Sequence, residues 1–174
     1  MTSQDSTIAT LFLQHSRHAL VEQCWPRLRA AVESLLPHQI WWRPNPASNS
    51  IGNLLLHLNG NVRQWLIDSF SQRHDRRDRP AEFSATGELS VEALIANLGA
   101  TIDEASAILA RLTPQELAAS YSIQGYPALS GLEAVYHVVE HFSMHYGQIL
   151  YIAKTLTAAD LGFYSELNRT GRAE

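Results

Sequence analysis

Apolar residues recur every three to four positions in four long stretches of the chain, which is the spacing of one face of an α-helix. The stretches cover residues 8–36, 51–66, 91–112 and 131–156. Pro37 ends the first stretch, and Pro26 inside it predicts a kink or a break near Trp25. We find no convincing strand pattern. The sequence therefore predicts an all-α fold in which four helices form a four-helix bundle.

Capping signals predict where these helices begin. Asn49 or Ser50 caps the second helix and Ser90 opens the third. The capping box TPQE (113–116) has proline at the first helical position and predicts a short extra helix. A second capping box, SGLE (130–133), starts the last long helix. The linkers of about 14, 20 and 17 residues exceed the usual bundle connections, so long crossover connections are expected.

Two linkers have a distinctive composition. RPNPASNS (43–50) is rich in proline and asparagine and is expected to be a loop. SQRHDRRDRPAEFSATGEL (71–89) is charged and punctuated by glycine and proline. Its basic residues could contact an anionic partner, but Asp75 and Asp78 are interleaved with them. We therefore favour a solvated surface loop over a binding segment.

Composition bounds the class of protein. A chain of 174 residues, 45% apolar and 17% charged, suits one globular domain spanning residues 1–174. The net charge of −4 gives no electrostatic basis for non-specific nucleic-acid binding. The N-terminus lacks the pattern of a signal peptide, and no stretch has 18 unbroken apolar residues, so no membrane span is expected. The single Cys24 excludes an internal disulfide and suits a reducing compartment, so we predict a cytoplasmic protein.

Histidine is unusually concentrated in the last helix. The stretch HVVEHFSMH places His137, His141 and His145 four residues apart, one helical turn above the next. On a helical wheel His145 lies about 20° outside the apolar sector, His141 about 60° and His137 about 100°. His141 and His145 are therefore expected at the edge of the core, and His137 is expected to lean toward solvent.

The second helix carries a matching histidine. His57 lies about 60° from the edge of its apolar stripe, with Asn61 one turn later. Together with His141 and His145 it would supply three nitrogen ligands to one metal ion and leave a coordination position open for water or a thiol. Spacing alone leaves the simpler alternative open, because paired surface imidazoles and hydrogen-bonded core histidines are common.

Other candidate residues around this site have weaker support. Asn61 and Gln148 could assist a substrate or a metal-bound water, although polar residues at a bundle rim are more common. No Asp or Glu is placed beside the three histidines, so the catalytic group and the general base stay unknown. Trp41 and Trp42 could line the mouth of the site, but packing at a bundle end or a dimer contact is favoured. Cys24 has no sequence-local partner that would make it a nucleophile.

Two separated stretches resemble a known family. SNSIGNLLLHLNGNVRQWL (48–66) and YHVVEHFSMHYGQILYI (136–152) are similar to the two motif helices of the DinB/YfiT-like superfamily, and RDRPAEF (77–83) between them also resembles it. Members are four-helix bundles with a divalent metal held by three histidines. The resemblance carries this role to His57, His141 and His145, and leaves His137 outside the triad.

The resemblance also implies expectations about function. It implies a zinc or nickel ion, self-association into a homodimer, a bacterial origin and a small-molecule substrate, which is a thiol in some relatives. Characterised relatives include thiol S-transferases that use bacillithiol or mycothiol, and others are named metal-dependent hydrolases. We therefore expect a metal-dependent hydrolase or thiol S-transferase. The alternative is a non-catalytic stress-response or binding module whose metal is structural or vestigial, which a three-ligand site argues against mildly.

Overall fold

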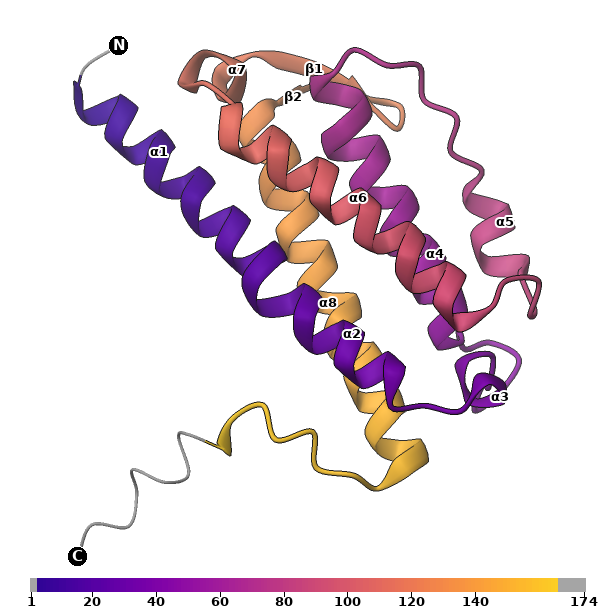
Figure 1. Ribbon diagram of the computed structural model, residues 1–174. Coiled ribbons are helices and arrows are strands. Elements are labelled where there is room, and N and C mark those ends of the chain that lie inside the picture. The colour runs from indigo at the N-terminus through magenta and orange to yellow at the C-terminus, as the bar shows by residue number, and fades with distance from the viewer. Residues whose placement is uncertain (1–2, 166–174) are drawn as a thin grey trace, which may run out of the picture.

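Four long helical units lie side by side in the computed structural model, which describes residues 3–165 (Figure 1). The units are α1 (Ser3–Arg17) with η1 (His18–Cys24) and α2 (Trp25–Glu33); α4 (Ile51–Val62) with η2 (Arg63–Asp68); α6 (Val91–Arg111); and α8 (Gly131–Thr157). The segments η1 and η2 are π-helical. Short helices α3 (Pro37–Ile40), α5 (Arg79–Ser84) and α7 (Pro114–Ala118) lie in the connections. The predicted bundle with long connections and a short extra helix is confirmed.

The helices begin where their capping residues predict. The side chains of Ser50, Ser90, Thr113 and Ser130 each accept a hydrogen bond from the backbone N–H three residues later. These bonds satisfy amides that have no partner within the helix. Of the two candidates for the second helix, the cap is therefore Ser50.

The first helical unit is wider just before its proline. Residues His18–Cys24 form a π-helical turn, and the Trp25 N–H bonds to the Leu20 carbonyl five residues earlier. Pro26 then stands in the first turn of α2, where its missing N–H costs little. The predicted irregularity near Trp25 therefore takes the form of a π-turn, and the helix continues through it.

One connection joins two long helices that run in the same direction, and the other two join helices that run in opposite directions. Helices α4 and α6 run in the same direction in Figure 1, so the chain must return along the bundle between them. The returning segment contains α5, which packs against α4. The expectation that residues 71–89 form only a surface loop is therefore wrong. Asp78 caps α5 by accepting from the Ala81 N–H, and Pro80 stands in its first turn.

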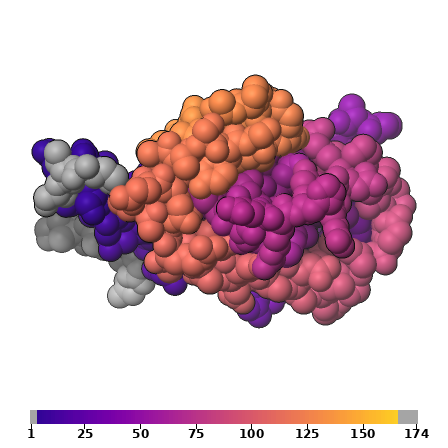
Figure 2. Space-filling view, turned by 90° about the horizontal axis from the view of Figure 1, so that it is seen from above, coloured from indigo at the N-terminus to yellow at the C-terminus, as the bar shows by residue number. Residues whose placement is uncertain are grey.

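A small β-hairpin also departs from the expected all-α fold. Strand β1 (Ser120–Ile123) pairs antiparallel with β2 (Tyr126–Ser130) through a turn at Gln124 and Gly125, both with positive φ. Positive φ at both central residues is characteristic of a type I′ turn, whose twist matches that of the two paired strands. The hairpin covers one end of the bundle, which faces the viewer in Figure 2. There the Trp65 indole N–H donates to Gln124, 2.9 Å away.

The core lies between the four long helices. Leu28, Leu58, Leu98 and Phe142, one from each unit, are at most 1% exposed. Among the described residues α6 alone is long and apolar enough to cross a membrane by length and composition. A buried bundle helix passes the same test, and α6 packs against α1, α2 and α4.

Candidate metal centre

Three histidines from two helices converge at the interface between α4 and α8. One nitrogen from each of His57, His141 and His145 lies within 4.8 Å of the others. The ring centroids of these three residues are 4.5–5.0 Å apart. His57 is 4% exposed, deeper than the helical wheel indicated, and the other two are half-buried. The structure therefore brings together all three histidines that the sequence singles out.

The environment of His141 and His145 favours neutral imidazoles. Burial and the neighbouring imidazoles lower the pKa of His141 to about 3. Burial also lowers the pKa of His145, against the hydrogen bond that His145 donates to Gln148. Neutral imidazole is the form that ligates a metal. The donor set therefore fits a divalent cation.

Hydrogen bonding fixes the tautomer of His57. Its Nδ1 lies 2.8 Å from Glu82 Oε2 on α5. Burial opposes ionisation of Glu82, but hydrogen bonds from Arg77 and His57 outweigh it and lower the pKa of this carboxyl. Because a carboxylate can only accept, His57 Nδ1 carries the proton and Nε2 keeps its lone pair. That lone pair faces His141 Nε2, 3.0 Å away.

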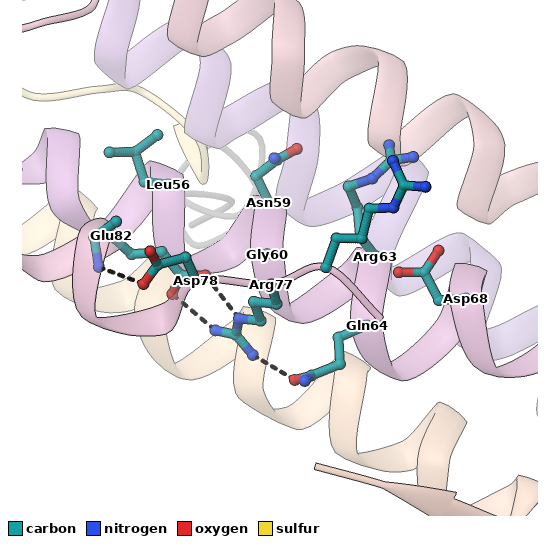
Figure 3. Close-up of a pocket in the computed structure, with 11 residues that line it drawn as sticks. Leu56, Asn59, Gly60, Arg63, Gln64, Asp68, Arg77, Asp78 and Glu82 are labelled. Carbon is teal, nitrogen blue, oxygen red and sulfur yellow. Dashed lines mark hydrogen bonds and ion pairs between the residues drawn. The ribbon is translucent and has the colours of Figure 1, made fainter. Parts of the chain in front are cut away.

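Arg77 holds Glu82 in place with two parallel bonds. Its Nε is 2.7 Å from Glu82 Oε1 and its Nη2 is 2.9 Å from Oε2, while Nη1 donates to Gln64 (Figure 3). The side chains of Arg77 and Glu82 are only 5% and 9% exposed. Arg77 Nη2 is also 3.0 Å from His57 Nδ1, but two donors cannot share a hydrogen bond, so the bond to the carboxylate is the one that forms.

Gly60 gives this ion pair room to lie against α4. A Cβ at Gly60 would collide with Glu82 Oε1 and lie 2.8 Å from Arg77 Nε. Glycine one turn after His57 therefore lets the charged pair approach the helix backbone, as the close-up in Figure 3 shows.

Arg77 and Glu82 were not among the residues singled out from the sequence. The expectation that no acidic residue lies beside the histidines is wrong, because Glu82 bonds to His57. Residues 71–89 are mostly exposed, as expected, but the side chains of Arg77 and Glu82 are buried. The sequence does contain a signal for α5, because Asp78 followed by Pro80 marks the start of a helix that would orient Glu82. Glu82 is a positioning residue for His57. Paired with Arg77 and low in pKa, it is a poor general base, so that role stays unassigned.

Gln148 orients the third histidine of the cluster. Its Oε1 accepts from His145 Nδ1 at 2.7 Å, which leaves His145 Nε2 as the free ring nitrogen. The sequence-based expectation for Gln148 was contact with a substrate or a bound water. In the structure its side-chain oxygen instead holds the His145 ring, while the residue itself is exposed.

His137 lies differently from its prediction. It is half-buried and stacks on Trp65 with 3.8 Å between ring centroids, rather than leaning into solvent. Its Nε2 lies 3.1 Å from Asn61 Nδ2, so Asn61 contacts His137. Asn61 Oδ1 is buried without a hydrogen-bond partner among the described residues. His137 belongs to the hairpin end of the α4–α8 interface, beside the cluster.

The remaining candidates lie away from the histidines. Burial raises the pKa of the Cys24 thiol, which lies 3.8 Å from Ser143 Oγ, so Cys24 is not activated as a nucleophile. Trp41 packs on α4 at Gly52, where a Cβ would lie 2.7 Å from its ring. Trp42 is 37% exposed. Packing, the favoured reading for Trp41, agrees with this arrangement.

Comparison with known proteins agrees with the fold and the motifs. A crystal structure described as a conserved protein from Enterococcus faecalis has a TM-score of 0.70 to this chain. It is 14% identical, and the match covers 84% of this chain and 97% of that one, which shows a shared fold. No curated protein matches. The family model of the DinB superfamily matches residues 20–149, a range that includes all three clustered histidines. The chain belongs to the DinB superfamily.

Proposed function

We propose that the protein binds one divalent metal ion through His57, His141 and His145 and uses it in catalysis on a small molecule. One observation carries the proposal: three histidine nitrogens lie within 4.8 Å of one another, two of their rings being oriented by Glu82 and Gln148. A carboxylate or amide acceptor behind a ligating imidazole is the usual arrangement at protein metal sites.

The donor set favours particular metals. Imidazole nitrogens suit zinc and nickel, whereas calcium and magnesium prefer oxygen ligands. Structural zinc sites usually close with four protein ligands, and catalytic sites keep a position open. Three protein ligands therefore favour zinc or nickel in a catalytic role over a structural one.

The chemistry expected at this site is hydrolysis or thiol transfer. When bound, such an ion supplies Lewis-acid activation of water or of a thiol. Glu82 and Arg77 hold the His57 ring with Nε2 directed at the cluster, and Gln148 holds His145. The cytoplasmic location and the homodimer also stay proposals, the latter open to light scattering on the purified protein.

Metal content tests the ligand set. Protein purified without an affinity tag should carry about one zinc or nickel ion per chain after loading and desalting. His57→Ala, His141→Ala and His145→Ala should each bring this well below one, whereas exposed His38→Ala should not. Full loading of all three cluster variants would rule out the proposed site.

Activity separates an enzyme from a binding module. The metal-loaded protein is offered thiols with electrophilic acceptors, and separately esters and amides. Turnover that His145→Ala abolishes supports the enzyme. Metal loading without turnover on any of these substrates favours the binding module.

A further inference from the structure

The two helices that carry the histidines also line a groove one turn away. Leu54 lies three residues before His57 on α4, and Gln148 lies three residues after His145 on α8. These helices run antiparallel, as the pairing of His57 with His141 and of Trp65 with His137 requires. Both wall residues are therefore displaced to the same side of the cluster, by about 5 Å along the helix axes.

The groove is uncharged and large enough for a small molecule. Its volume is about 580 Å³, within the usual range of ligand sites. The α4 and α8 walls consist of Leu54, Met144, Gly147, Gln148, Tyr151 and Ile152, and the loop before α4 supplies the rest. None of these described lining residues is charged, whereas six of the eleven residues around the cavity in Figure 3 are.

No packing contact in the described part of the chain explains why position 147 is a glycine. A Cβ at this position would meet nothing within 4 Å among the described residues. Glycine inside a helix costs about 1 kcal/mol relative to alanine, and here no neighbour requires it. Its absent side chain instead widens the groove between Met144 and Tyr151, which are 53% and 75% exposed.

The opposite side of the cluster is filled by protein. There His137 stacks on Trp65 and contacts Asn61, and the β-hairpin covers the end of the bundle. Gln148, by contrast, both lines the groove and holds His145. A ligand in the groove therefore has direct access to a residue that orients the cluster.

We propose that this groove binds the uncharged, apolar portion of the substrate, an inference that rests on the proposed function. An ionised group here would lose hydration without gaining a charged partner, so neutral molecules should bind better than anions or cations of the same shape. The substrate class is thus an organic molecule that carries a neutral aromatic or aliphatic body.

Binding of matched naphthalene probes to the metal-free full chain tests the proposal. We expect 2-naphthol, neutral at pH 7, to bind at least ten-fold more tightly than 2-naphthoate, as measured by NMR titration. Gly147→Met should weaken 2-naphthol binding at least ten-fold, because the methionine side chain fills the groove. Methionine is a better helix former than glycine, so α8 should stay folded. The control Thr155→Met, exposed on the same helix, should bind 2-naphthol normally.

Equal binding of 2-naphthol by Gly147→Met and wild type overturns the proposal. A change in oligomeric state caused by Gly147→Met but not by Thr155→Met also overturns it, since a second copy would then occupy the groove.

A charge placed in the groove provides a second variant. Ala47→Glu, at an exposed lining position, should weaken 2-naphthol and shift preference toward 2-naphthylmethylammonium. An unchanged order of preference contradicts the assignment. His57→Ala distinguishes this proposal from the metal site, because it should lose the metal and keep 2-naphthol. Wild-type protein that loads metal normally but does not bind 2-naphthol would overturn the groove proposal alone. Wild-type protein that binds 2-naphthol but does not load metal would overturn the metal-site proposal alone.

Discussion

Arg77 and Glu82 form a bidentate ion pair that is buried against the backbone of α4 and bonded to His57. Paired in this way, both charges tolerate burial that an isolated charge would not. The pair comes from a segment whose composition suggested a solvated loop.

Glu82→Gln should weaken metal binding. The substitution keeps the shape but removes the charge that accepts from His57 Nδ1, and loss of such a partner typically costs 10–100-fold in metal affinity. It also leaves Arg77 buried without its counter-charge, which should lower the free energy of unfolding by about 3–5 kcal/mol. Competition with a chromophoric chelator and urea denaturation measure the two effects. The control Glu33→Gln removes an exposed partner of Arg29 and should change neither much. Wild-type affinity in Glu82→Gln would exclude the positioning role.

The same substitution at two helical glycines should have opposite effects. Gly60→Ala puts a methyl group against the Arg77–Glu82 pair and should destabilise the protein by about 1–3 kcal/mol. Gly147→Ala adds its methyl in open space and should stabilise α8 by up to about 1 kcal/mol. Denaturant melts of both variants provide the comparison. Equal shifts would mean that the ion pair does not need the space at Gly60.

His137→Ala should keep the metal and lose stability. Asn61, which is 2% exposed, would lose its contact with His137, and an unpaired buried polar group costs about 1–3 kcal/mol. Trp65 would also lose its stacked ring. Metal content and thermal melting, measured beside His141→Ala, separate the two histidines. Loss of metal from His137→Ala would place this residue among the ligands.

Cys24 should react slowly in the folded protein. Burial raises the pKa of its thiol, against a hydrogen bond with Ser143 and the charge of Arg27, so at pH 8 less of it is thiolate than for an exposed cysteine. Iodoacetamide should label native protein at least ten-fold more slowly than protein in denaturant, and the native rate should level off at a higher pH than the rate in denaturant. Mass spectrometry gives a clean readout, because the chain has one cysteine. Equal rates would show an accessible thiol.

The bundle is predictable because its signals are local. Helical periodicity and the caps at Ser50, Ser90 and Ser130 lie within a few residues of the features that they specify. The hairpin is harder to recognise, because its strands have only four and five residues and its turn begins with Gln124 rather than asparagine at positive φ.

The candidate site is only partly predictable for a different reason. Spacing on two helices identified His57, His141 and His145, but the burial of His137 depends on Trp65, which a single-helix wheel does not include. The burial of Glu82 likewise depends on Arg77 and on the space at Gly60. Such contacts between separate elements leave no periodic pattern in one sequence.

His57 and His141 are separated by 84 positions along the chain, yet their rings meet. During synthesis the first of them leaves the ribosome long before the last helix exists. No early fragment can therefore assemble the three-histidine constellation, and any ion that it acquires must be captured after translation has passed His145. The supply of metal ions around the finished chain, more than that around the nascent one, would decide which cation it carries.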